Sequence, residues 1–79
     1  MNPHASRVRC LDVRPIIAAG GSPFEDIMAA AGTLAAGESL LLITPFLPSP
    51  IIERLQSEGF RARPERRADG GWQTHFTPG

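Results

Sequence analysis

The alternation of apolar and polar residues predicts the first two strands of a sheet. Residues 7–13 mix β-branched and polar side chains and stop before Pro15, a pattern typical of a strand. Leu11 and Val13 then share one face of that strand, because successive side chains point to opposite faces. Residues 39–44 are continuously apolar, which indicates a central strand that is covered on much of both faces.

A first helix is expected over residues 23–35, after a loop at residues 15–21. Ser22 has the position of an N-cap, Pro23 that of the first helical residue, and Glu25 completes a capping box. Apolar residues recur at helical spacing through this segment, which predicts one buried face. They are Phe24, Ile27, Met28, Ala31 and Leu34, and Gly37 is the expected left-handed terminator.

A second helix is expected after Ser49, which is placed to cap it, with Pro50 at the first position and Gly59 at its end. Ile51, Ile52 and Leu55 supply its apolar face.

The last part of the chain predicts a hairpin of two strands, 60–65 and 72–76, around a turn at residues 69–71. Pro64 has no N–H to donate to an interior ladder, so the first of these strands belongs at an edge of the sheet. The element order is then β-α-β-α-β-β. Right-handed crossovers place both helices on one face. The predicted fold is an α+β two-layer sandwich, with a four-stranded mixed sheet, two helices on one face and the other face open.

Five short motifs carry a resemblance to a known family: "LDVRP", "AAGESLLLI", "PFLPSP", "SEGF" and "DGGW". Over residues 11–76 the chain resembles a bacterial family of unknown function that is related to the TusA/SirA sulfur carriers. The resemblance implies the strand order 1-2-4-3, with strand 4 antiparallel to the others. Residues 1–6 are expected to form a flexible N-terminus, and residues 7–79 a single TusA-like domain.

The resemblance also bears on function. In TusA-like carriers a Cys-Pro-x-Pro motif opens the first helix, and its cysteine holds a persulfide. Here that place reads Ser22-Pro23-Phe24-Glu25, and a serine hydroxyl cannot form a persulfide. The chain is therefore expected to be a non-catalytic binding or interaction module without a cofactor. The resemblance suggests a role in bacterial sulfur or nitrogen redox metabolism.

Charge and apolar runs exclude some classes of partner. The chain has eight basic residues, all of them arginine, and eight acidic residues, so its formal net charge is zero. No overall field then attracts nucleic acid or an anionic membrane, and nucleic acid is an unexpected partner. The longest apolar run, 40–43, is too short to span a bilayer. A cytoplasmic location is expected.

Two small groups of residues are candidates for a ligand site. Gly20, Gly21 and Ser22 lead into the first helix, where free N–H groups can bind an anion. A plain flexible loop is the other interpretation. Asp12 and Arg14 share one strand face and are expected either to pair with each other or to bind a ligand.

Cys10 is the only cysteine, so it cannot form an internal disulfide. It is the candidate for a displaced sulfur site, which gives an alternative function, sulfur transfer through Cys10. A small packed side chain is the other interpretation. His4, Cys10 and His75 do not have the spacing of metal ligands, and no metal site is predicted.

Arginines near the predicted edge strand are candidates for a polyanion patch, which gives a second alternative function, binding of RNA or another polyanion. The residues are Arg61, Arg63 and Arg67, with Arg66 between them. Trp72 and Phe76 fall in the opposite register, so this face lacks aromatic side chains for base stacking. A solvated, charged strand that resists aggregation is the other interpretation.

The open face of the sheet is the expected interface. Either Leu40 and Leu42 or Leu41 and Ile43 must point away from the helices. An apolar patch of this kind favours a protein partner or a homodimer.

Overall fold

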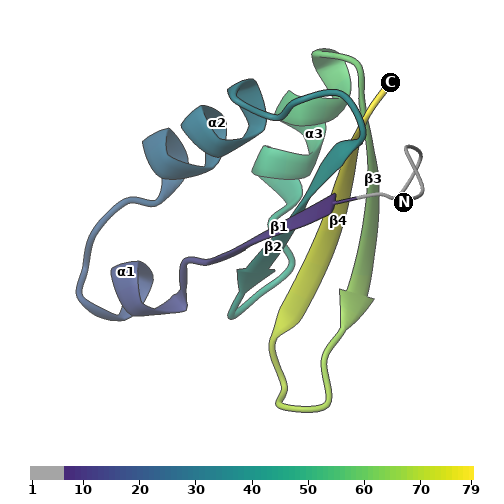
Figure 1. Ribbon diagram of the computed structural model, residues 1–79. Helices are drawn as coiled ribbons and strands as arrows, with labels where there is room; N and C mark the ends of the chain where they lie inside the picture. Colours follow the sequence, from purple (N-terminus) through teal and green to yellow (C-terminus); the bar gives the residue numbers. More distant parts are fainter. Residues whose placement is uncertain (1–6) are drawn as a thin grey trace.

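The computed structural model describes residues 7–79, and the predicted flexible N-terminus, 1–6, lies outside them (Figure 1). Within the described residues, four strands and three helices follow one another. They are β1 (Arg7–Asp12), α1 (Arg14–Ala18), α2 (Phe24–Gly32), β2 (Glu38–Thr44), α3 (Ser49–Ser57), β3 (Phe60–Arg66) and β4 (Trp72–Pro78).

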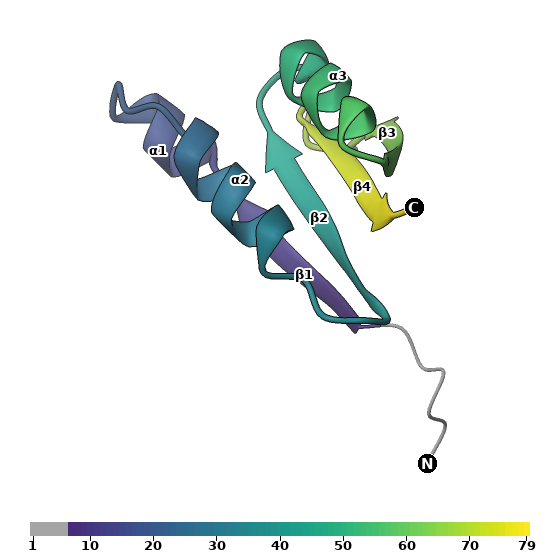
Figure 2. The ribbon, with the colours of Figure 1, turned by 90° about the horizontal axis from the view of Figure 1, so that it is seen from above.

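The strands form one mixed sheet in the order β1-β2-β4-β3. β1 runs parallel to β2, whereas β4 is antiparallel to both β2 and β3. Figures 1 and 2 show the helices on one side of the sheet, and none of the described elements covers the other side. The predicted sandwich and its strand order are confirmed, and Pro64 lies on an edge strand as its missing N–H requires.

The buried core lies between the sheet and the helices. Leu40, Leu42 and Phe76 are fully buried on the covered face, together with Ile27 of α2 and Leu55 of α3. Because strand side chains alternate, Leu41 and Ile43 point to the uncovered face, which resolves the alternative that the sequence leaves open.

The prediction of a loop at residues 15–21 is wrong, because the first part of this segment belongs to the short helix α1. Pro15 lies in the first turn, where a missing N–H costs nothing, and the N–H of Ile17 bonds to the carbonyl of Val13. Gly20 has φ 85°, a left-handed conformation that ends the turn. A single helical turn is too short to show apolar periodicity.

The expected helix caps are also wrong. Pro23, not Ser22, is the N-cap of α2, and Pro48, not Ser49, is the N-cap of α3; neither helix start has a side-chain capping bond. Pro23 already has helical dihedral angles, and its carbonyl accepts the N–H of Ile27. α2 also ends at Gly32, earlier than expected. The hydroxyl and N–H of Thr33 there bond back to the last carbonyls of the helix.

Candidate functional site

An apolar groove lies between α1, the start of α2, the loop that follows β2 and the start of α3. Its volume is about 400 Å³, a size that suits a small ligand or a few side chains of a partner. We call it the α2–α3 groove. It is lined by Ile17, Gly21, Ser22, Pro23, Phe24, Ile27, Thr44, Phe46, Pro48, Pro50 and Ile51.

The groove is apolar inside and at its rim. None of its described lining residues carries a charge. Phe24 is 40% exposed and Phe46 is 53% exposed, and Leu47 adds a third exposed apolar side chain beside them. The hydroxyl of Thr44 donates a hydrogen bond to the backbone carbonyl of Phe46 and so holds the loop after β2 in place. Exposed aromatic rings beside a hollow are the feature that distinguishes this part of the molecule.

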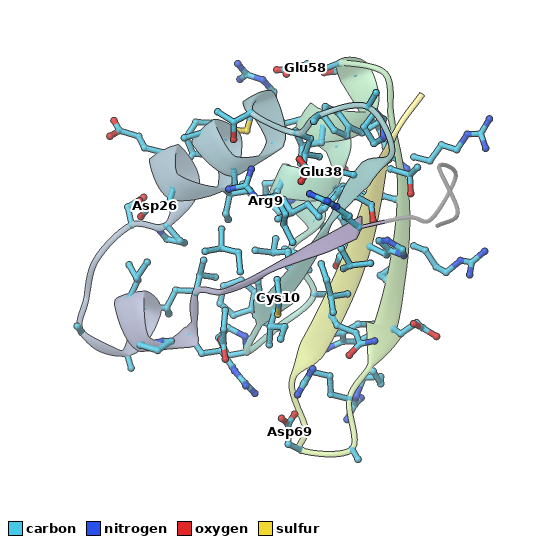
Figure 3. All side chains as sticks on the ribbon, in the orientation of Figure 1. Arg9, Cys10, Asp26, Glu38, Glu58 and Asp69 are labelled. Atoms are coloured by element: carbon cyan, nitrogen blue, oxygen red, sulfur yellow. The ribbon has the colours of Figure 1, made fainter. Side chains whose placement is uncertain are left out.

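Charged side chains lie on both of the helices, α2 and α3, whose starts line the groove. Glu25 and Asp26 lie in the first turn of α2, and Figure 3 shows Asp26 pointing outward there. Arg54 of α3 reaches over the ring of Phe24, with 5.9 Å between its guanidinium carbon and the ring centroid. Glu58 pairs with the same arginine, with 2.7 Å between Nε and Oε2. Glu25 and Asp26 have no cationic partner among the described residues, and helical spacing turns them away from the groove-lining Phe24 and Ile27.

The predicted anion residues at the start of α2 lie near this groove but offer few donors. Gly21 and Ser22 line the groove, whereas Gly20 does not. The N–H of Gly20 already bonds to the carbonyl of Ile17, and that of Gly21 to the carbonyl of Ile16. Anion binding here stays a prediction, although the N–H groups of Gly20 and Gly21 are used inside the loop.

Asp12 and Arg14 form the predicted ion pair, and the structure extends it to the β3–β4 turn. Arg14 Nη2 lies 2.8 Å from Asp12 Oδ2, and Arg14 Nη1 lies 2.9 Å from Asp69 Oδ2. Asp69 also accepts Arg67 Nε at 3.1 Å and the N–H of Gly71 at 2.9 Å. Figure 3 shows Asp69 in the turn between β3 and β4. We call these four charged side chains the Arg14 network; it ties the end of β1 to the hairpin.

The Arg14 network shifts the acidities of its members. The N–H of Gly71, followed by the guanidinium groups of Arg14 and Arg67, holds the pKa of Asp69 well below its usual range. The Arg14 side chain also lowers the pKa of Asp12. In return, the hydrogen bonds to Asp12 and Asp69 raise the pKa of Arg14. These pKa shifts favour the charged forms of all these groups, so the ion pairs of the Arg14 network stabilise the contact between the end of β1 and the hairpin turn.

Only two of the three predicted polyanion residues lie together, and polyanion binding stays a prediction. Arg61 and Arg63 are exposed on the uncovered face, where they line a shallow hollow with His75. Arg67 is held by Asp69 and also donates to Gln73 Oε1 at 3.0 Å.

Arg66 points to the helix side, where it lies over the ring of Trp72 at 5.6 Å. The aromatic residue is therefore on the opposite face from Arg61 and Arg63, as the register predicts.

Cys10 is exposed on the uncovered face of β1, in register with Leu41 of β2 (Figure 3). His75 of β4 pairs with the same leucine from the far side, so a whole strand separates it from the cysteine. His4 lies outside the described residues. Within residues 7–79 no three metal-ligating side chains gather. Sulfur transfer through Cys10 stays a prediction.

The uncovered face presents few apolar side chains. Val8 is 51% exposed, but Ile43 is only 7% exposed and Leu41 is half-buried. A protein partner or homodimer on this face stays a prediction that sedimentation can test. Among the described helices, none has the length and apolar character of a membrane span.

The fold and the α2–α3 groove define the class of protein. It is a small two-layer α+β domain with an apolar groove at the carboxyl end of its parallel strands. Residues 10–78 match the family model described as "Uncharacterized conserved protein (DUF2249)", and the chain belongs to that family. No curated protein and no solved structure matches the chain. The expected membership in a family of unknown function is therefore confirmed.

The groove was not predicted from the sequence. Its lining comes from three separate segments, and each of its apolar residues also fits the role of core or turn residue. The exposed "PF" at residues 45–46 was the one signal for it, since a phenylalanine after a strand-ending proline has no core to enter unless a partner supplies one.

Proposed function

We propose that this protein is a non-catalytic binding module whose α2–α3 groove takes a short apolar segment of a partner protein with a basic residue beside it. The observation that carries the proposal is an uncharged groove with two exposed aromatic side chains, Phe24 and Phe46, at its rim. Exposed apolar groups around a hollow favour a protein partner, because burying them removes apolar surface from water.

Position and charge support the same occupant. The groove lies beyond the carboxyl end of β2, the place where ligands commonly bind to parallel strands. Glu25 and Asp26 follow the groove-lining Phe24 in the first turn of α2 and would attract a basic flanking residue, whereas Arg54 is already paired with Glu58. A segment with an apolar anchor and an adjacent Lys or Arg fits both features.

The relation to TusA-like sulfur carriers belongs to this proposal. Ser22, which stands where a carrier would have its cysteine, lines the groove. In this proposal the module keeps the surface on which a carrier would bind its partners, but it has no cysteine sulfur there. A bacterial, cytoplasmic protein that docks to a component of sulfur or nitrogen redox metabolism is the role this proposal implies.

Selection from a library of random peptides tests the proposal, because it requires no particular partner to be chosen. Peptides displayed on phage are selected against the folded protein, and the consensus should combine a large apolar residue with a nearby Lys or Arg. Phe46→Ser should weaken the selected peptides about tenfold or more, while Val8→Ser should change their affinity by less than about twofold. Val8 is the matched control, since it is 51% exposed on the other face.

Two outcomes would contradict the proposal. Peptides that bind Phe46→Ser as well as the parent protein would remove the groove from the interaction. A consensus of acidic residues would contradict the role of Glu25 and Asp26, and a double variant, Glu25→Gln with Asp26→Asn, should weaken only peptides that carry the basic residue.

A further inference from the structure

A shallow hollow on the uncovered face gathers side chains that recognise anions. Its volume is about 350 Å³, and Arg61, Ala62, Arg63, His75 and Thr77 line it. The antiparallel register sets Arg61 opposite Thr77 and Arg63 opposite His75. We call it the β3–β4 hollow. It lies on the other side of the sheet from the α2–α3 groove, so the two sites are independent.

The two arginines of the hollow are free to bind a ligand. Both side chains are exposed, and neither pairs with a carboxylate among the described residues. Arg67, one position beyond β3, is instead occupied by Asp69. Arg61 and Arg63 are two residues apart on one strand, so their backbones are roughly 7 Å apart and both guanidinium groups can reach one anion between them.

His75 is held in a fixed orientation beside Arg63. Its Nε2 lies 2.6 Å from the hydroxyl of Ser39, which is only 5% exposed on the adjacent strand β2. No other hydrogen bond to this ring is formed within residues 7–79, which leaves Nδ1 for a ligand. Thr77 adds a hydroxyl that can donate or accept.

The carboxylates on this face lie outside the hollow. Glu65 pairs in register with Gln73, two residues along the strands from the pair of Arg63 and His75, and its Oε1 accepts a hydrogen bond from Gln73 Nε2 at 3.5 Å. Asp69 is neutralised within the Arg14 network. The local charge of the hollow is therefore positive, although the net charge of the chain is zero.

We propose that the β3–β4 hollow binds a tetrahedral oxyanion of the phosphate or sulfate type, carried by a small molecule. Arg61 and Arg63 provide paired N–H donors for its oxygens, and His75 and Thr77 complete the site. The volume of the hollow exceeds that of a bare ion and suits a small esterified ligand. Single-stranded RNA is disfavoured, because Trp72 and Phe76 lie on the opposite side of β4 and leave no stacking ring here.

NMR titration of the isotope-labelled protein tests this site. Inorganic phosphate, inorganic sulfate and a phosphate monoester are added separately, with sodium chloride at matched ionic strength as the reference. Saturable shifts should appear at the amides of Arg61, Arg63, His75 and Thr77, and a tighter monoester would identify the small molecule rather than the free ion as the ligand. Chloride should give no saturable shift.

Charge-matched variants separate the site from general electrostatics. Arg61→Gln and Arg63→Gln, each made alone, should weaken anion binding about tenfold or more, whereas Arg66→Gln, which removes the same charge on the other face of the same strand, should change it by less than about twofold. Thr77→Val retains the charge and should weaken binding by about threefold.

Several results would overturn the proposal. The first is the absence of saturable NMR shifts with all three anions. The second is a loss of anion affinity in Arg66→Gln as large as that in the Arg61 and Arg63 variants. The third is binding of single-stranded RNA by a protein that does not bind phosphate or sulfate. Circular dichroism of each variant establishes that it is folded, as expected for exposed positions.

Discussion

At the scale of single residues, Asp69 links the hairpin turn to the end of β1. Its pKa in the folded protein lies below the ordinary value of 3.8, so folding favours the ionised form. A lowered carboxyl pKa contributes stability that is fully present above the unfolded value and is lost as the pH falls through the folded value. The Arg14 network should therefore stabilise the protein at neutral pH and weaken in acid.

Asp69→Asn tests that role. The variant should melt at a lower temperature than the parent protein at about pH 7, and the difference should shrink as the pH is lowered from about 4 toward 2. Thermal unfolding followed by circular dichroism at several pH values measures it. Glu53→Gln, an exposed change on α3, is the control. A constant difference across the pH range would show that the ion pairs of Asp69 do not stabilise the fold.

Cys10 gives a second test at this scale. Its thiol is exposed on β1 and should react with maleimide in the folded protein. If the chain only binds partners, incubation with a cysteine desulfurase and cysteine should leave no persulfide on Cys10 by mass spectrometry. A persulfide that is absent in Cys10→Ala would instead support the sulfur-transfer alternative.

At the scale of elements, β2 has two leucines with different surroundings. Leu42 is fully buried beneath the helices, and Leu41 is half-buried on the uncovered face. Leu42→Ala should lower the free energy of unfolding by about 2–5 kcal/mol, because it leaves a cavity in the core. Leu41→Ala should cost about 1 kcal/mol. Urea unfolding of the two variants measures both, and equal losses would contradict the assigned faces.

Alternation and proline positions explain why the strands could be predicted. Pro64 placed β3 at an edge from its missing N–H alone, and the apolar run before Pro45 marked β2 as central. The helix starts could not be predicted in the same way. A serine before a proline fits a cap, but whether its hydroxyl reaches an N–H depends on backbone angles that the local sequence does not determine.

The candidate site was predicted less well than the fold, because its residues come from segments that are far apart in the sequence. Arg14 and Asp69 are 55 positions apart, and only the assembled sheet brings them together. Asp12 and Arg14, two positions apart, were predictable as a pair. The lining of the α2–α3 groove and the pairing of Ser39 with His75 likewise depend on contacts between distant segments.

At the scale of the whole molecule, the strand order determines when the protein can complete its fold. β4, which follows all the other elements in the chain, pairs with β2 on one side and β3 on the other. Until residues 72–78 have left the ribosome, β2 has one unpaired edge, β3 has no partner strand, and the core lacks Phe76. The sheet can therefore be completed only after β4 has emerged, and until then the unpaired strand edges are open to aggregation.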